Sequence, residues 1–273
     1  MAESPGTLFD RLVEIMARLR GNGGCPWDRE QTRTTLKAYL IEEAYEVLEA
    51  LEAGDEAHLQ EELGDVLLQV LFHAQIASEL GEFAIGDVLQ RLVDKMVRRH
   101  PHVFGDVPVA TAEEALAQWE ALKRREAAAE GRSRSAIDGV PRALPALLRA
   151  QRMQAKAARV RFDWPDAGAA WQKVEEEVRE SAAVIAGGDR ARVADELGDL
   201  LFSVVNVARL AGLDAEDALS GAIEKFRRRF TDMEGDLRGR GRPLEGVSPE
   251  EMERSWEMAK AQERARAQDT GSP

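Results

Sequence analysis

The residues of this chain that could do chemistry are two sets of carboxylates with the same spacing. Each set has an E-E-x-x-E segment, which begins at Glu42 in the first copy and at Glu176 in the second. An E-x-x-D segment follows each one, and every acid of the second set lies 134 positions after its counterpart. Because gathered carboxylates repel each other, a fold that brings five of them together usually holds a hard divalent cation between them.

The predicted metal ligands in each copy are the five acids of these two segments. In the second copy they are Glu176, Glu177, Glu180, Glu196 and Asp199, and in the first copy they are Glu42, Glu43, Glu46, Glu62 and Asp65. Oxygen-only ligation favours Mg²⁺, with Mn²⁺ as an acceptable substitute, over iron, since neither segment contains the Glu-x-x-His pattern of helical di-iron sites. The alternative for any single glutamate is a solvated surface position. Repetition of the whole pattern at one constant shift argues against that alternative.

The elements that must position these acids are predicted to be helices. Apolar residues recur three and four positions apart over residues 35–53 and 58–80, and the Gly54-Asp55 pair between them predicts a helical hairpin with Asp55 as the N-cap. The second copy repeats this plan, with Asp189 opening its second helix. Acids three or four positions apart on such helices share one face, near the seam between the helices. Since no strand-like alternation stands out, the fold class is predicted to be all-α.

The duplication divides the chain into two halves of similar plan. Further helices are expected in each half, so the repeated module is roughly a hundred residues long, too long for a solenoid repeat. A segment rich in Gly, Arg and Ser breaks the helical pattern shortly before Gly139 and Pro141. The segment from Cys25 to Asp28 is predicted to be a structured loop that leads into the first acidic helix. The predicted organisation is an N-terminal helical domain over residues 1–130, a linker over 131–140 and a C-terminal helical domain over 141–273.

Composition and charge exclude several classes of partner. The net charge of the 273 residues is −13, and a strongly acidic chain is a poor general binder of nucleic acid or of an anionic membrane surface. The single cysteine, Cys25, allows no intrachain disulfide, which fits a reducing compartment. No apolar run approaches the roughly 20 residues that cross a bilayer, and the N-terminal segment lacks the apolar core of a signal peptide. We therefore expect a cytoplasmic protein with no nucleic-acid or membrane partner.

A basic cluster recurs once in each half and offers a place for phosphate groups. The guanidinium group of arginine can donate two hydrogen bonds to one phosphate, and the ammonium group of lysine attracts phosphate by its charge. Cations in the last turn of a helix also offset the helix dipole. A tryptophan follows each basic cluster, with a lysine four positions later, and could stack on a base, although a single tryptophan is more often a core residue. A further cation, Arg192, lies one helical turn before Glu196, the first acid of the second E-x-x-D segment. The candidate nucleotide-binding residues are Arg192, Lys225, Arg228, Arg229, Trp256 and Lys260.

Taken together, these segments resemble the MazG family of nucleoside triphosphate pyrophosphohydrolases. The resemblance covers nearly the whole chain, including the tandem arrangement of bacterial members. It rests on CPWD at 25–28, EEAYEV at 42–47, ELGDVL at 62–67, RRHPHVF at 98–104, RFDW at 161–164, VNVAR at 205–209, EKFRRRF at 224–230 and the Trp256/Lys260 pair. One departure is Arg192, where the family leads us to expect lysine; arginine keeps the charge and changes the hydrogen-bond geometry.

The resemblance implies tandem all-α bundles, a homodimer, Mg²⁺ dependence, and binding of nucleotides such as ATP. The implied reaction is hydrolysis of NTP or dNTP to the monophosphate and pyrophosphate. It also implies that the C-terminal copy is the main catalytic unit. In that copy one glutamate of the pair Glu176 and Glu177 would orient or deprotonate the attacking water, and Lys225 and Arg229 would stabilise charge on the pyrophosphate. The first copy keeps all five acids, so the sequence leaves its activity open.

Two other functions stay open from the sequence. One is a narrower pyrophosphatase that acts on dUTP or another non-standard nucleotide. The other is a non-catalytic helical module that senses nucleotides or mediates assembly. Intact acids in both copies argue against the second alternative.

Overall fold

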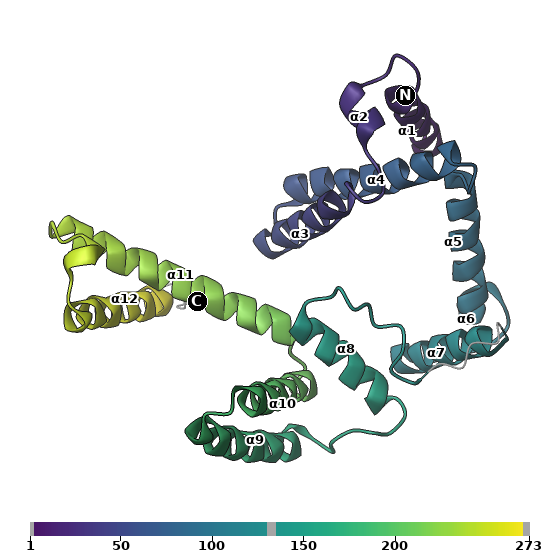
Figure 1. The fold of residues 1–273 in the computed structure, drawn as a ribbon. Helices are drawn as coiled ribbons and strands as arrows, with labels where there is room; N and C mark the ends of the chain where they lie inside the picture. Colours follow the sequence, from purple (N-terminus) through teal and green to yellow (C-terminus); the bar gives the residue numbers. More distant parts are fainter. Residues whose placement is uncertain (1–2, 130–134, 270–273) are drawn as a thin grey trace. The chain divides into compact units, whose positions relative to one another are not determined.

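The computed structural model describes residues 3–129 and 135–269, which form helices joined by short loops (Figure 1). No β-strand occurs among these residues, so the predicted all-α class is confirmed. The chain divides into two compact units, Met1–Lys123 and Arg124–Pro273, and each carries one acidic copy. The linker expected over 131–140 lies partly outside the described residues, and its bounds, like those of the two domains, stay a prediction.

The acidic helices of the first unit are α3 (Lys37–Ala53) and α4 (Glu56–Glu79), which lie side by side and run in opposite directions (Figure 1). Gly54 ends α3 with a φ of 66°, a left-handed conformation that glycine adopts without strain. Asp55 then caps α4, because its Oδ1 accepts hydrogen bonds from the backbone N–H groups of Ala57 and His58 at 3.1 and 3.0 Å. The predicted hairpin and its N-cap are confirmed.

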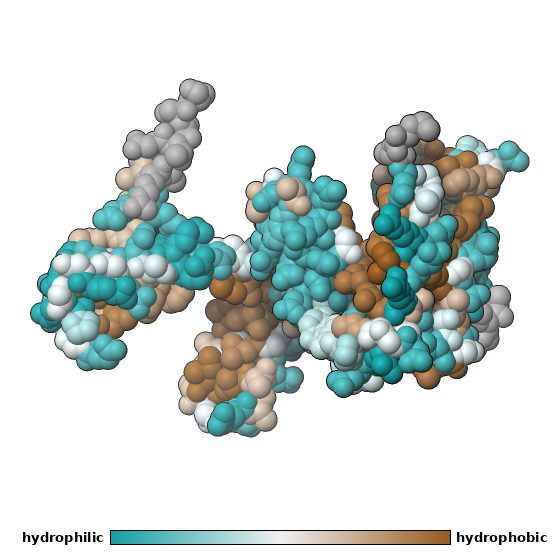
Figure 2. Space-filling model, turned by 90° about the horizontal axis from the view of Figure 1, so that it is seen from above, coloured by the Kyte–Doolittle hydropathy of each residue, from teal (hydrophilic) through white to brown (hydrophobic). Residues whose placement is uncertain are grey.

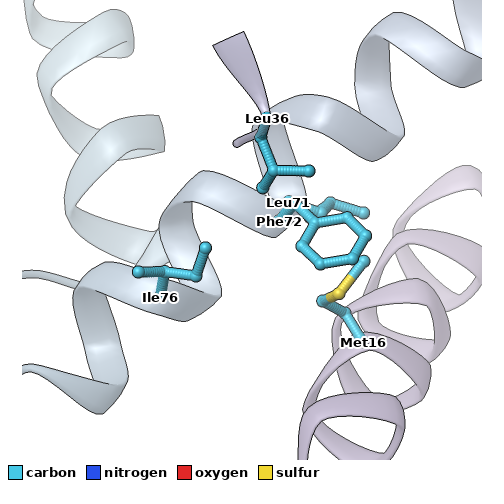
Figure 3. Close-up of a cluster of buried hydrophobic side chains, with 5 residues drawn as sticks. All are labelled: Met16, Leu36, Leu71, Phe72 and Ile76. Atoms are coloured by element: carbon cyan, nitrogen blue, oxygen red, sulfur yellow. The ribbon is translucent and has the colours of Figure 1, made fainter. Parts of the chain in front are cut away.

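Two helices ahead of this hairpin complete the core of the first unit. They are α1 (Pro5–Arg20) and α2 (Pro26–Glu30), and α1 packs against α4. The buried side chains that meet there are Met16, Leu36, Leu71, Phe72 and Ile76 (Figure 3). The loop expected from Cys25 to Asp28 is wrong, because Pro26 opens a short helix; its fixed φ suits the first helical position. The unit continues through α5 (Ile85–Arg99) and α6 (Pro101–Phe104) into α7 (Ala112–Ala129), within which it ends at Lys123.

The second unit repeats the acidic hairpin with α9 (Ala167–Gly187) and α10 (Arg190–Leu210). Gly188 takes the left-handed conformation with a φ of 74°, and Asp189 caps α10 through the backbone N–H of Ala191 at 3.1 Å. Against this hairpin packs α8 (Ala146–Ala158), which also contacts α11 (Ala215–Gly239). A short 3₁₀ turn, η1 (Leu244–Gly246), leads to α12 (Pro249–Asp269), which packs along α11 (Figure 1).

The two copies differ in the length of their second acidic helix. Helix α4 has 24 residues and α10 has 21. The loop after α10 is also one residue shorter than the loop after α4, so the shift between the copies falls from 134 positions at the start of these helices to 130 at the start of α5 and α11. The basic clusters, which are Lys95, Arg98 and Arg99 on α5 and Lys225, Arg228 and Arg229 on α11, consequently lie at the same distance along their own helices but not at the same distance from the acids.

Apolar side chains also reach the surface in patches (Figure 2). On the first acidic hairpin the exposed ones include Ile41, Tyr45, Leu48, Leu51 and Leu63. On the second they include Val178, Ile185, Leu197, Leu201 and Val204. Part of the apolar stripe that predicts each amphipathic helix is therefore left uncovered within its own unit.

Candidate metal and nucleotide site

Each acidic hairpin gathers three carboxylates from its two helices. In the first unit these are Glu43 of α3 with Glu62 and Asp65 of α4, which we call the N-terminal cluster. In the second unit they are Glu177 and Glu180 of α9 with Glu196 of α10, which we call the C-terminal cluster. Within each cluster, one oxygen from each carboxylate lies within 4.8 Å of the others. This spacing lets one cation contact all three groups.

The remaining predicted ligands lie outside these two groups of three. Glu42 and Glu176, one position before a cluster member, are exposed, since one residue turns a helix by about 100° away from the seam. Asp199 is also exposed. Glu46 lies close enough to Glu62 for the two carboxyl groups to interact. The structure thus brings together three of the five predicted acids in each copy. Two members of each cluster correspond, and the third is Asp65 in the first copy and Glu180 in the second.

The N-terminal cluster contains a deeply buried carboxyl group. Glu62 is 7% exposed; its Oε1 contacts Nε2 of His58 at 3.0 Å, and its Oε2 has no hydrogen-bond partner. Burial raises the pKa of Glu62, and the adjacent Glu46 charge raises it further. Burial likewise raises the pKa of Glu43. The amide of Gln69 donates a hydrogen bond to Oε1 of Glu43 at 3.2 Å, which partly offsets this rise. Both shifts show that burial, with the neighbouring acids, disfavours the charged form of these two carboxyl groups, which a bound cation would instead stabilise.

The C-terminal cluster carries its own counter-ion. The Nζ of Lys173 lies 2.7 Å from Oε1 of Glu177, which is 4% exposed, and 2.7 Å from Oε1 of Glu176. These hydrogen bonds raise the pKa of Lys173, and the same contact lowers the pKa of Glu176. Sequence reasoning missed this lysine. The signal was its position three and four residues before two acids of the same helix, the spacing at which helical side chains meet.

The cations beside the acids are not the same in the two copies. Counting back 134 positions from Lys173 leads to Tyr39, and counting back from Arg192 leads to His58. His58 contacts the buried Glu62, as described above, whereas Arg192 is exposed on α10. The C-terminal copy therefore has two permanent positive charges where the N-terminal copy has a phenol and an imidazole.

The predicted phosphate-binding cations lie on α11 and α12. Arg228 and Arg229 both contact the carboxylate of Glu263 on α12, at 3.2 and 2.6 Å, while Lys225 is exposed. Lys260 pairs with Glu257 of its own helix at 2.6 Å. Among the described residues, none of these cations forms a hydrogen bond or ion pair with the C-terminal cluster. Their role in nucleotide binding stays a prediction.

Trp256 is half-buried in the described chain. It packs against the cluster of Met233, Leu237 and Val247, and its ring centre lies 5.3 Å from that of Phe226 on α11. Trp256 therefore packs in the hydrophobic core of its unit, as tryptophan more often does. A contact with a nucleotide base would use the part of the ring that stays exposed.

Comparison with known proteins decides the family. The MazG nucleotide pyrophosphohydrolase domain matches this chain twice, over residues 31–104 and 169–233, and each match contains one acidic hairpin. The chain belongs to the MazG family. It is 48% identical over 261 residues to the nucleoside triphosphate pyrophosphohydrolase of Escherichia coli K12, which covers 93% of this chain and 98% of that protein. The predicted resemblance and the tandem MazG domains are confirmed.

Other MazG relatives support the same assignment. The chain is 46% identical over 255 residues to the nucleoside triphosphate pyrophosphohydrolase/pyrophosphatase MazG of Thermotoga maritima, covering 93% of this chain and 96% of that protein. A nucleoside triphosphate pyrophosphohydrolase of Mycolicibacterium smegmatis is 43% identical over 156 residues, 56% of this chain and 47% of that protein.

Among the described helices, none is both long and apolar enough to cross a membrane.

Proposed function

We propose that this chain hydrolyses nucleoside triphosphates, ribo or deoxy, to the monophosphate and pyrophosphate in a Mg²⁺-dependent reaction. The observation that carries the proposal is the gathering of Glu177, Glu180 and Glu196 within 4.8 Å on facing helices of a MazG-family chain. The relatives from E. coli and T. maritima that align over nearly their whole length carry the name of this activity. We propose the C-terminal copy as the main catalytic unit.

The donor set of the C-terminal cluster fits a hard divalent ion. All three gathered groups are carboxylates, and Lys173 pairs with only one of them, Glu177, so the cluster keeps negative charge that a cation would offset. Oxygen ligands favour Mg²⁺, with Mn²⁺ as substitute, over softer metals. Asp199, one turn after Glu196 on α10, is the further proposed ligand. When bound, Mg²⁺ supplies positive charge that holds the triphosphate and offsets the charge that develops during cleavage.

The remaining groups of the copy position the reactants. Glu176, exposed beside the cluster, is placed to orient or deprotonate the attacking water, and Glu177 is the other candidate for this role. Lys173, which bonds both of them, can turn towards a phosphate oxygen when a metal ion takes its place. The proposed phosphate contacts are Arg192, Lys225, Arg228 and Arg229, and Trp256 and Lys260 are the proposed contacts to base and ribose. On binding, the phosphate would replace the carboxylate of Glu263 as the hydrogen-bond partner of Arg228 and Arg229.

We also propose that the enzyme is a cytoplasmic homodimer. The exposed apolar side chains on both acidic hairpins are the support, since soluble chains rarely leave such patches without a partner. A second copy of the chain would cover them and bring further cations towards the acids. Sedimentation equilibrium is expected to give the dimer mass, and a monomer at micromolar concentration would contradict the proposal.

The test of the catalytic assignment is Glu196→Gln, measured by pyrophosphate release from a panel of NTPs and dNTPs with Mg²⁺. The amide keeps the shape and removes the charge. Loss of a residue that only supports a metal ligand typically costs about 10–100-fold, so loss of a ligand itself is expected to lower turnover by at least about a hundredfold. Asp195→Asn is the matched control, because Asp195 is the exposed neighbour on α10 and lies outside the cluster. Parental turnover in Glu196→Gln would refute the assignment. Turnover restricted to dUTP or another non-standard nucleotide would narrow the substrate class.

A further inference from the structure

A polar network joins the loop ahead of α9 to the far end of α10. The guanidinium group of Arg209 on α10 contacts Oδ1 of Asp163, which lies in the loop between α8 and α9. The side-chain oxygen of Asn206, one turn earlier on α10, accepts hydrogen bonds from Nε and Nη2 of Arg209 at 3.1 and 2.6 Å. The side chains of Arg209 and Asp163 are 14% and 25% exposed, so salt and solvent screen the pair only in part. We call these three residues the polar network.

The loop that carries Asp163 has a constrained backbone. Arg161 has a φ of 65°, the left-handed region that residues other than glycine enter only at a cost in energy. Such a conformation persists where the surrounding contacts impose it. The backbone N–H of Phe162 bonds the end of α8, at the carbonyl of Ala157, with a distance of 3.1 Å. The loop is thus held by α8 on one side and by α10 on the other.

The position of this loop determines how α9 lies on α10. Helix α9 begins four residues after Asp163, and Asp166 caps it by accepting a hydrogen bond from a backbone N–H at 2.8 Å. Glu177 lies ten residues into the helix, a rise of about 15 Å. Since a helix of this length bends only slightly, a rotation at its start also turns its acids. Rotation of α9 would therefore move Glu177 and Glu180 away from Glu196 on α10.

The two copies hold the open end of the hairpin by different means. Helix α4 buries seven residues within its unit, whereas α10 buries one, Val205. Counting back 134 positions from Asn206 leads to Phe72, a member of the buried core of the first unit, and counting back from Arg209 leads to Gln75. Apolar packing thus fixes this end of the hairpin in the first unit, and the polar network occupies the same place in the second.

We propose that Asp163, Asn206 and Arg209 are positioning residues for the C-terminal cluster. The Gly188 turn joins α9 and α10 at one end, and the ion pair holds the start of α9 on α10 at the other. This double attachment keeps the acids of α9 within reach of the cation that they share with Glu196. The inference rests on the proposed function, since it requires that this cluster bind a divalent ion. The three residues act through the orientation of the helices and touch neither metal nor substrate.

Calorimetric titration of the full chain with Mn²⁺ tests the positioning role. Every chain carries Glu62→Gln, so that the titration reports chiefly on the C-terminal cluster. Arg209→Met and Asp163→Asn are each expected to raise the dissociation constant roughly tenfold, the low end for groups that orient metal ligands. The double variant is expected to lose no more than either single variant, because both remove the same ion pair. The control is Arg242→Met, which removes an ion pair with Glu251, 2.8 Å long, outside the acidic hairpin, and is expected to keep the parental affinity.

A second measurement separates positioning from stability. The urea midpoint of each variant is determined beside its Mn²⁺ affinity, and Asp163→Asn, which keeps the shape of the side chain, is the milder variant if Arg209→Met does not fold. Parental Mn²⁺ affinity in folded Asp163→Asn, or losses that add in the double variant, would overturn the positioning role even where the urea midpoint falls. Absence of both Mn²⁺ binding and pyrophosphate release in the parent would instead overturn the proposed function, and this inference with it.

Discussion

Removal of the built-in counter-ion should make the C-terminal cluster bind metal more tightly. In the metal-free chain the ammonium group of Lys173 lies 2.7 Å from the buried carboxylate of Glu177, and a divalent ion must replace it. A hydrogen bond to a charged group contributes about 1.5–3 kcal/mol, and the lower end applies because the lysine side chain is 33% exposed and solvent weakens the pair. About 1.5 kcal/mol corresponds to roughly tenfold in affinity.

The variant that tests this reasoning is Lys173→Met, which keeps the length of the side chain. Without nucleotide, its dissociation constant for Mn²⁺, measured by calorimetry, is expected to fall roughly tenfold, and the gain should shrink at high salt because salt screens partly exposed charges. Arg190→Met is the control, since Arg190 is an exposed cation of the same hairpin outside the cluster. Unchanged or weaker Mn²⁺ binding in Lys173→Met would refute the idea that lysine and metal compete for the same acids.

Two further predictions concern ion pairs elsewhere in the chain. Both oxygens of Glu79 bond the guanidinium group of Arg20, at 2.9 and 2.7 Å, and this lowers the pKa of Glu79. Glu79→Gln should therefore reduce the free energy of unfolding by about 1 kcal/mol at pH 7. The reduction should shrink as the pH falls below the ordinary pKa and should disappear once the pH passes the lowered pKa, where the parental carboxylate is protonated in the folded chain as well. Urea unfolding at pH 7 and pH 3 checks this, and an equal loss at both would contradict it. Glu263→Gln releases Arg228 and Arg229, so KM for a triphosphate should fall severalfold with kcat unchanged in steady-state kinetics, and a raised KM would show that Glu263 positions the arginines instead.

The hairpins could be predicted because their signals are local. Helical periodicity, a glycine that accepts a left-handed turn and an aspartate that caps the next helix all act within a few residues. Asp55 and Asp189 each perform the predicted cap. Over the two acidic hairpins, the constant shift of 134 positions carries these conclusions from one copy to the other.

The membership of each cluster could not be predicted, since it depends on how two helices are rotated about their seam. The sequence treats Glu42 and Glu43 alike, yet only Glu43 joins its cluster. The same rotation leaves Asp199 exposed while its counterpart Asp65 joins the N-terminal cluster. Lys173 could not be predicted from the repeat, because Tyr39 stands at its counterpart, and the ring contacts of Trp27 with Tyr39 and Phe72 depend on how α2 packs on the hairpin.

The measurement that tests the central claim most directly is the number of Mn²⁺ ions that the full chain binds, read by electron paramagnetic resonance of the free ion. If carboxylates from facing helices share a cation, Glu196→Gln binds fewer ions than the parent and loses pyrophosphate release, while Asp195→Asn matches the parent in both. Undiminished Mn²⁺ binding in Glu196→Gln would contradict the account.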